Sequence, residues 1–541
     1  MAVMSGRRRS HWAWGYEDEL ASPAELRGIA ELLAAGTGLT LPGDLETPVP
    51  LAQVRLPQPR VTVPARLGAI CSQDPHDRAR HAHGMAYRDL IQAFRGQLRH
   101  VPDVVARPRD EHDLEELLGW CAAAGLALIP FGGGTSVVGG VEPRVGSSYA
   151  GTMSADLSRF SQVLEADPVS GAARIQAGAT GPALNAQLAP RGLMLRHFPQ
   201  SYEFSTLGGW LATRAGGHYA TGPTHIDDLV ESIRAVTPAG CWQSRRLPGS
   251  GAGVSPDRML LGSEGILGVI TEAWVRVQRP PRYRAAASVR FGSLSAGAAA
   301  VREITASGLR PAGCRLLDPA EAALSAGGDG RHALLMLGFE SADHDQAPWL
   351  AAALQHARAH GGSWDGVRST GPGAAGGPGE AGQSGRWRES FLRMPYLRNA
   401  FPAIGVLAET FESAVTWDAF PAFHEQVTAA AAAAAREACG SPAVITCRLA
   451  FAYPDGPAPY YTVLAAARRG EEAGQWDAIK ASVSDAVLAA GGTITHHHAV
   501  GRDHRPWYDQ QRPEPFAAAL RAAKAAVDPE EVLNPGVLVG P

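Results

Sequence analysis

The pattern of apolar and polar positions predicts alternating helices and strands from about residue 101 onward. The stretch 113–131 predicts a helix followed by a buried strand. Two strand-like pieces then flank a turn at 167–171, and 181–192 predicts another helix. Two further strands are predicted within 227–240 and 268–281. This succession predicts an α+β fold.

The rest of the chain divides by composition. Residues 1–97 hold short amphipathic pieces and predict an N-terminal helical region. A first α+β domain is predicted over 98–281, and a second, a sheet flanked by alanine-rich helices, over 282–490. A C-terminal segment, 491–541, contains a helix that stops near Asp528-Pro529. Within the second domain, 368–385 is rich in glycine and proline and predicts a surface loop.

The composition of the chain argues against several classes of function. The 541 residues carry a net charge of −4 with no basic block, so no nucleic-acid partner is predicted. Lysine occurs only at Lys480 and Lys524, which argues against a P-loop or a Schiff-base lysine. The six cysteines form no CxxC pair, as in a reduced intracellular protein. No signal peptide or membrane-spanning segment is evident, so a cytoplasmic protein is predicted, with peripheral membrane contact left open.

A glycine-rich loop, Gly132-Gly133-Gly134-Thr135-Ser136, directly follows the buried strand. It lacks the lysine of a Walker A loop, and no helix-forming sequence follows it as in a Rossmann fingerprint. A pyrophosphate cradle and an ordinary tight turn both remain open. The stretches 199–222 and 260–275 are also rich in small residues. Together the three segments indicate a long, flat ligand that carries phosphate.

Three consecutive histidines, His496, His497 and His498, form a second unusual feature. Neighbouring residues are a poor chelate for one ion, so no metal site is predicted. The β-type residues 493–495 predict an extended entry into the triplet. On a strand, His496 and His498 would share one face and His497 would look away.

Several motifs carry a family resemblance. "PFGGGTS" (130–136), "TLGGWLATRAGG" (206–217) and "GSEGILGVITEA" (262–273) resemble the FAD-binding domain of the vanillyl-alcohol oxidase and p-cresol methylhydroxylase flavoproteins. Within that superfamily, motifs such as "HWAWGYEDEL" (11–20) and "THHHAVG" (495–501) are similar to the alkyldihydroxyacetonephosphate synthase family. The resemblance implies a two-subdomain FAD-binding domain over 98–281 and an α+β cap domain over 282–490.

The resemblance also implies an activity. Members of this family exchange the acyl chain of acyl-dihydroxyacetone phosphate for a long-chain alcohol, forming an ether bond through a flavin N5 adduct. A homodimer is expected. The loop contains no histidine or cysteine, so FAD is expected to be non-covalent. The implied FAD contacts are Pro130, Phe131, Gly132, Gly133, Gly134, Thr135, Ser136, Gln200, Ser201, Tyr202, Glu203, Phe204, Ser205, Thr206, Thr213, Arg214, Ala215, Gly216, Glu264, Gly265, Ile266, Leu267, Gly268, Val269 and Ile270.

The same resemblance implies a catalytic set. Tyr460 is the expected acid/base, with Tyr461 as the alternative, and its phenol would need nearby cations from the triplet and an arginine to act near pH 7. Of the histidines, His496 and His498 are expected to face the flavin. Arg398 is expected to bind the phosphate and Arg315 to tune the catalytic end of the site.

Two other functions remain open. One is an FAD-dependent dehydrogenase or oxidase of a 2-hydroxy acid from the same superfamily. The other is an inactive FAD-binding scaffold. Gln200 stands where the family carries an acidic residue, and the glycine-proline loop replaces a segment near the expected substrate channel, so the lipid chain preference is open.

Overall fold

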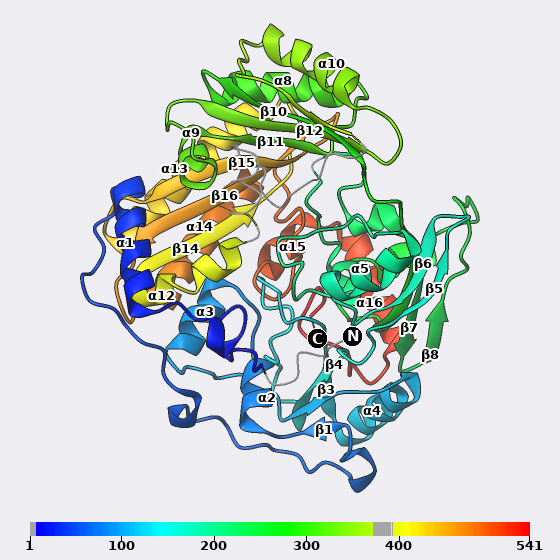
Figure 1. The fold of residues 1–541 in the computed structure, drawn as a ribbon. Coiled ribbons are helices and arrows are strands. Elements are labelled where there is room, and N and C mark those ends of the chain that lie inside the picture. The colour runs from blue at the N-terminus through cyan, green and yellow to red at the C-terminus, as the bar shows by residue number, and fades with distance from the viewer. Residues whose placement is uncertain (1–6, 220, 372–390, 392, 541) are drawn as a thin grey trace.

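The computed structural model of the protein describes residues 7–219, 221–371, 391 and 393–540. Figure 1 shows three β-sheets, with the largest at the top and the two smaller ones below it. The N-terminal region forms short helices: α1 (Pro23–Thr37), α2 (Pro75–Arg80), α3 (Tyr87–Phe94) and 3-10 turns at Glu17–Glu19, Leu51–Gln53 and Ala65–Leu67.

The first sheet has the strand order β1-β2-β4-β3. Its last three strands are parallel, and β3 and β4 are almost entirely buried, as the apolar sequence of β3 predicts for that strand. The predicted helix and buried strand of 113–131 are confirmed. The elements are β1 (Cys71–Ser72), β2 (Val104–Ala106), α4 (Glu111–Ala124), β3 (Leu126–Phe131) and β4 (Gly151–Asp156).

The second sheet is antiparallel, with the order β5-β6-β9-β7-β8. The hairpin predicted around 167–171 joins its first two strands, and the predicted helix and the two later strands are also present. Its elements are β5 (Val163–Asp167), β6 (Ala172–Gln176), α5 (Gly181–Leu188), a 3-10 turn (Ala189–Arg191), α6 (Leu207–Thr213), a 3-10 turn (Ile226–Leu229), β7 (Val230–Thr237), β8 (Gly240–Gln243), α7 (Pro256–Leu260) and β9 (Val269–Arg276).

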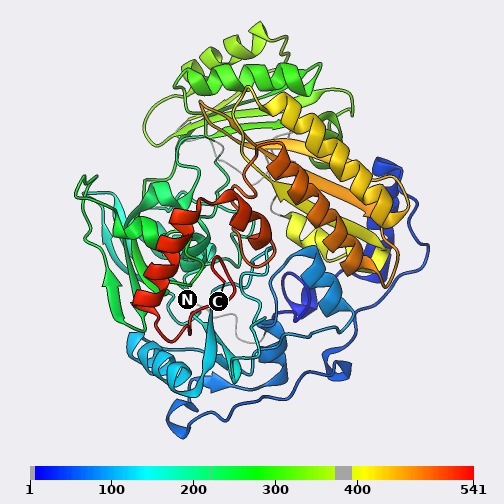
Figure 2. The same cartoon turned by 180° about the vertical axis from the view of Figure 1, so that it is seen from behind.

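The third sheet is antiparallel, with the order β13-β10-β12-β11-β15-β16-β14. Helices cover one face, as Figure 2 shows from behind, and the other face, which carries the short helix α9 (Pro319–Ala326), turns toward the smaller sheets. Its elements are β10 (Tyr283–Phe291), α8 (Leu294–Ala306), β11 (Gly313–Leu317), α9 (Pro319–Ala326), β12 (Ala333–Ser341), α10 (Ala347–Ala359), β13 (Arg368–Thr370), α12 (Phe401–Ile404), β14 (Val406–Glu412), α13 (Phe420–Cys439), β15 (Val444–Ala452), β16 (Pro457–Ala466) and α14 (Glu472–Ala489).

The predicted glycine-proline loop begins inside this sheet. Its first residues form the edge strand β13, and residues 372–385 of the predicted loop lie outside the described residues. None of the helices in the described part of the chain has the length and apolar character needed to cross a membrane. All six cysteines lie in the described part and are free.

The C-terminal segment forms α15 (Arg505–Gln511) and α16 (Glu514–Val527) and then returns to the first sheet. Leu533 bridges Leu128 in β3 in parallel. A buried ion pair between Lys524 and Asp528 secures this return, because Lys524 also donates to the carbonyl oxygen of Leu533 at 2.8 Å and Asp528 accepts from the backbone N–H of Val532 at 3.0 Å.

Lys524→Met is therefore expected to lower the free energy of unfolding by about 3–5 kcal/mol, because it leaves the fully buried Asp528 carboxylate without its cation. Chemical denaturation measures the change. Adding Asp528→Asn to the same chain should restore part of the loss. A double variant as unstable as the single one would show that the uncompensated charge is not the cause.

Candidate active site

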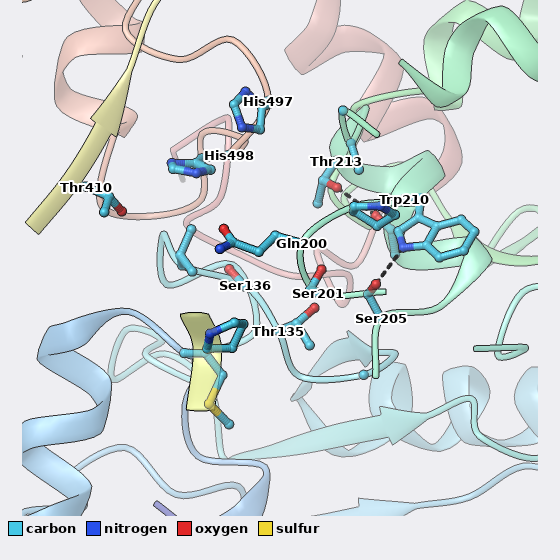
Figure 3. Close-up of a pocket in the computed structure, with 18 of the residues that line it drawn as sticks. Thr135, Ser136, Gln200, Ser201, Ser205, Trp210, Thr213, Thr410, His497 and His498 are labelled. Atoms are coloured by element: carbon cyan, nitrogen blue, oxygen red, sulfur yellow. Dashed lines mark hydrogen bonds between the residues drawn. The ribbon is translucent and has the colours of Figure 1, made fainter. Parts of the chain in front are cut away.

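The main pocket lies between the two smaller sheets and the face of the third sheet that carries Arg315, Arg448 and Tyr460. It holds about 1410 Å³ of empty space, including the part open to solvent. Figure 3 shows Thr135 and Ser136 on one side and His497 and His498 across from them. The predicted residues that line it are Gly132, Gly133, Gly134, Thr135, Ser136, Gln200, Ser201, Ser205, Thr206, Thr213, Ala215, Gly216, Arg315, Arg398, Tyr460, His497 and His498.

The glycine-rich loop fits an anion. Larger residues would clash at two of its glycines. A Cβ at Gly133 would lie 1.9 Å from the carbonyl oxygen of Phe204, and one at Gly132 would lie 2.4 Å from the hydroxyl of Thr206. The buried guanidinium of Arg80 donates to the Gly133 carbonyl at 2.9 Å and holds the loop from behind. Within the described residues, the backbone N–H groups of 132–136 donate to no protein acceptor. Five free donors at the end of a strand can cradle a pyrophosphate.

Residues 200–216 contribute the next wall. Ser205 accepts a 2.7 Å hydrogen bond from the Trp210 indole, and Thr213 donates to the Gly209 carbonyl at 2.8 Å, as Figure 3 shows. The remaining predicted FAD contacts of this region have protein partners elsewhere. Tyr202 donates to the Gly181 carbonyl, Glu203 accepts from Tyr396, Phe204 packs on Trp14, and Arg214 pairs with Asp227.

Residues 264–270 were predicted to contact FAD, and so were Pro130 and Phe131, but these residues lie outside the pocket lining. Glu264 instead accepts the backbone N–H groups of Val500 at 2.9 Å and Gly501 at 2.8 Å. Burial raises the pKa of this carboxyl to about 7. Glu264 therefore ties the second sheet to the segment that follows the histidines.

The pleat of β16 separates the two candidate tyrosines. Tyr460 lines the pocket, whereas Tyr461 lies on the opposite face, stacked on Phe411 with its hydroxyl 3.2 Å from His424 Nδ1. Tyr460 has positive charge beside it, because the guanidinium of Arg448, its cross-strand neighbour, lies 3.9 Å from the ring centroid. Only Tyr460 is placed to act in the pocket.

Arg398 is a half-buried cation in the pocket wall. No hydrogen bond or ion pair joins its side chain to another described residue, and its Nε is buried without a partner. Burial lowers the pKa of Arg398, a cost that a bound anion would offset. Arg315 also lines the pocket, 3.4 Å from His218 Nδ1, and burial lowers its pKa to about 9.

The histidine triplet wraps around one carboxylate. Glu412, at the end of β14, is buried and accepts from the backbone N–H groups of His496, His497 and His498, with the His498 bond at 2.9 Å. The Thr495 hydroxyl donates to it at 2.6 Å. Burial alone would raise the pKa of Glu412, but the surrounding histidines and the Thr495 hydroxyl outweigh burial and hold it well below its usual range.

The predicted strand through the triplet is therefore wrong. The three residues form bends around the carboxylate, and strand alternation does not apply. His497 and His498 line the pocket, and His496 points behind it, with its Nε2 2.9 Å from the Tyr453 hydroxyl. The prediction that His496 faces the flavin and His497 braces the back is reversed.

The histidines also do not supply positive charge at neutral pH. Burial lowers the pKa of His497 to about 3 and that of His498 to about 4, although Glu412 partly opposes the shift. Both rings keep some accessible surface, 16% and 14% of the side chain, along the pocket. The cations near Tyr460 are arginines, and the imidazoles act as neutral donors and acceptors.

Glu412, His496 and His497 each place one ligand atom within 4.8 Å of the others, a spacing that could hold a metal ion. The carboxylate already accepts several N–H and O–H groups in this arrangement. We therefore assign Glu412 to shaping the loop.

Sequence reasoning missed several pocket residues. The sequence around Arg448 does not mark it as a site residue, since only its pairing with Tyr460 on the neighbouring strand brings it into the site. Trp14 comes from the N-terminal motif "HWAWGYEDEL" and is fixed by Asn399, beside Arg398. Other lining residues that were not predicted are Met85, Leu90, Val137, Val141, Pro199, Gly209, Trp210, Gly217, Phe391, Pro395, Thr410, Ala450 and Phe451.

Two protein-family models match the chain: "FAD binding domain" over 102–244 and "FAD linked oxidases, C-terminal domain" over 280–538. The chain is 29% identical over 519 residues to an alkyldihydroxyacetonephosphate synthase of Trypanosoma brucei brucei, spanning 90% of this chain and 82% of that protein. The chain belongs to the FAD-linked oxidase superfamily and is a homologue of alkyldihydroxyacetonephosphate synthase.

Solved structures agree with this assignment. An alkyldihydroxyacetonephosphate synthase structure superposes with a TM-score of 0.78 at 25% identity, covering 97% of this chain and 98% of the other. The p-cresol methylhydroxylase structure with substrate bound shares the fold at a TM-score of 0.65 and 13% identity, over 97% and 98% of the chains. The predicted fold class is thus confirmed. A glycolate oxidase subunit of Bacillus subtilis is also similar, 24% identical over 459 residues, 81% of this chain and 89% of that protein.

Because buried histidines are neutral in the folded protein, we expect the protein to lose stability in acid. His504 is buried, and burial lowers its pKa from 6.5 to about 3. Above pH 6.5 the folded and unfolded states are both neutral; as pH falls below 6.5, the unfolded state takes up the proton first, so stability is lost toward pH 4. Each such group contributes a slope of about 1.4 kcal/mol per pH unit.

Denaturation measured between pH 7 and pH 4 tests this expectation. His504→Asn should be less stable at pH 7, because it loses the bond to the Ala499 carbonyl, but its stability should fall less steeply with acid. His112→Asn, at an exposed position of α4, is the matched control and should keep the wild-type slope. Equal slopes in all three proteins would contradict the assignment of a neutral His504.

Proposed function

We propose that the protein is an alkylglycerone-phosphate synthase, which exchanges the acyl chain of acyl-dihydroxyacetone phosphate for a long-chain alcohol. Homology to the synthases supports the reaction class. The observation that carries the proposal is Arg398, whose buried Nε has no partner and which lies beside Tyr460 and His498 in the same pocket as the glycine loop. The homodimer, the cytoplasmic location and peripheral membrane contact stay predictions.

The hydrogen-bond donors of the glycine-rich loop fit an FAD that is held without a covalent link. The free N–H groups of 132–136 would hold its pyrophosphate, and the small residues of 205–216 would leave room for a flat ring. The bound cofactor would supply an isoalloxazine ring that accepts and returns electron density at the substrate carbon. The loop itself offers no cysteine or histidine for attachment.

The substrate-binding roles follow from charge. Arg398 offers a guanidinium with free N–H donors, which suits phosphate oxygens. Tyr460 is the group placed to move a proton at a substrate carbon, and Arg448 over its ring would stabilise a negative oxygen there. His498, a neutral imidazole 5.4 Å from the Tyr460 ring between centroids, can orient the same substrate by hydrogen bonding.

A second function is favoured by one observation, the similarity to a glycolate oxidase subunit. A 2-hydroxy acid is also an anion, and its carboxylate could take the place of the phosphate on Arg398. Anaerobic addition of glycolate or lactate to the FAD-loaded protein separates the two functions. Bleaching of the flavin absorbance by these acids, with no ether product from acyl-dihydroxyacetone phosphate and labelled hexadecanol, would replace the synthase by a dehydrogenase.

Tyr460→Phe is expected to keep bound FAD but to lose on the order of 100-fold to 10,000-fold in kcat, because only the proton-transferring hydroxyl is removed. Ether product is quantified by mass spectrometry. Tyr461→Phe is the matched control, since its hydroxyl lies on the opposite face of the strand. Loss of activity in Tyr461→Phe with full activity in Tyr460→Phe would reverse the assignment.

Arg398→Met is expected to raise KM for acyl-dihydroxyacetone phosphate by on the order of tenfold to 100-fold, because the phosphate loses a charged donor. FAD binding, followed by flavin absorbance, should be unchanged. Arg290→Met, on the surface of β10, is the control and removes an exposed ion pair with Asp365. An unchanged KM in Arg398→Met would show that the phosphate binds elsewhere.

A further inference from the structure

A continuous chain of polar groups leads from the pocket wall to a partly exposed histidine. His497 lines the pocket, and its Nδ1 lies 3.1 Å from Nδ1 of His496. His496 Nε2 lies 2.9 Å from the Tyr453 hydroxyl, which lies 2.9 Å from the Thr224 hydroxyl. Thr224 in turn lies 3.2 Å from Nδ1 of His225. Each contact is within hydrogen-bonding distance.

The end of this hydrogen-bonded series at His225 fixes the direction of every bond in it. His225 Nε2 lies 3.1 Å from the backbone carbonyl oxygen of His496, which can only accept. A neutral His225 therefore carries its proton on Nε2, and its Nδ1 must accept from the Thr224 hydroxyl. The Thr224 oxygen then accepts from the Tyr453 hydroxyl.

The directions of the remaining hydrogen bonds, from Tyr453 to the pocket, follow in the same way. Because Tyr453 donates to Thr224, its oxygen accepts from His496 Nε2–H. His496 Nδ1 is then an acceptor and takes the Nδ1–H of His497. Burial lowers the pKa of both imidazoles, so one proton each is the resting state. His497 is left with an unprotonated Nε2.

We propose that these five side chains form a proton relay between the pocket and the exterior, with His497 Nε2 as the entry point. A proton taken up at Nε2 releases the Nδ1 proton to His496, and the shift passes through Tyr453 and Thr224 to His225 Nδ1. The charge leaves His497 and reaches His225, which is only half-buried, and release to water requires the Nε2–H to leave the His496 carbonyl oxygen. The hydroxyls and imidazoles then reorient for the next proton.

The relay deepens the proposed function and rests on it for its purpose. Replacing an ester by an ether releases the fatty acid as a carboxylate and one proton, which derives from the alcohol O–H. Glu412 is a poor sink for that proton, because its oxygens already accept the backbone of the triplet. The path through His496 gives the proton a way out of the pocket.

Packing holds the relay in place. The His225 and His496 rings lie 4.5 Å apart between centroids, and Phe451, a pocket residue, lies 5.0 Å from the His496 ring. Phe451 thus stands between His496 and the pocket, so protons reach His496 through His497. Tyr453 and Thr224 act through His497 and are positioning residues.

Kinetics of the FAD-loaded protein test the relay. Tyr453→Phe and Thr224→Val each remove one hydroxyl link and are expected to lower kcat by on the order of tenfold to 100-fold. KM and FAD affinity should stay within about twofold of the wild-type values, as expected for a substitution that disturbs no other contact. The solvent deuterium isotope effect should rise, and added imidazole buffer should restore part of the rate.

Tyr149→Phe is the matched control. It also loses one hydroxyl hydrogen bond, to the Glu531 carbonyl, but lies outside the pocket lining and the relay. A kcat in Tyr453→Phe equal to that of Tyr149→Phe would overturn the relay. So would a loss that imidazole does not rescue and that leaves the isotope effect unchanged.

Nitrogen NMR of the full-length, FAD-loaded protein with 15N-labelled histidine tests the bond directions without any substrate. The expected protonated nitrogens are Nε2 of His225 and His496 and Nδ1 of His497. Any other tautomer among the three overturns the relay. The expected tautomers in a protein that forms no ether product would mean that the proposed function has failed while the relay stands.

Discussion

The site depends on one buried negative charge. Glu412 sits at the end of β14 with its carboxylate inside the protein, where an unpaired charge would be costly. Its oxygens are satisfied by the backbone of the histidine triplet, from a segment 84 to 86 residues later in the chain. This contact bends the triplet and directs two imidazoles into the pocket and one away from it. Together with the bond from the Ser413 hydroxyl to the Thr493 carbonyl, it fixes the C-terminal segment against the cap sheet.

Three distant parts of the chain meet around that contact. The glycine loop after β3 is held by Arg80 from the N-terminal region, and Glu264 ties the second sheet to the residues just after the triplet. The chain end then returns to β3 through Leu533. The first two links are buried side chains that satisfy backbone groups of another segment, and the third is a backbone bridge. The pocket is therefore a product of the whole fold, and damage to one link is expected to reach the others.

Periodicity predicted much of the fold, because burial patterns are local. The apolar run of β3, the hairpin between β5 and β6 and the amphipathic helices can be read from neighbouring residues alone. The triplet shows where local reasoning fails. Residues 493–495 favour a strand, but a carboxylate far upstream in sequence supplies acceptors that bend the backbone instead. Arg448 was missed for a similar reason, since its place depends on its register with Tyr460 across two strands.

The resemblance pointed to many residues that line the pocket but could not supply their charge states. The sequence suggested that the histidines would provide the positive charge near Tyr460, whereas burial lowers the pKa of His497 and His498 and leaves that task to Arg448 and Arg398. Arginine holds its charge even when buried, and imidazole does not. The pocket thereby separates two tasks that the sequence had joined. The arginines can bind an anion at all times, and the neutral imidazoles stay free to exchange protons.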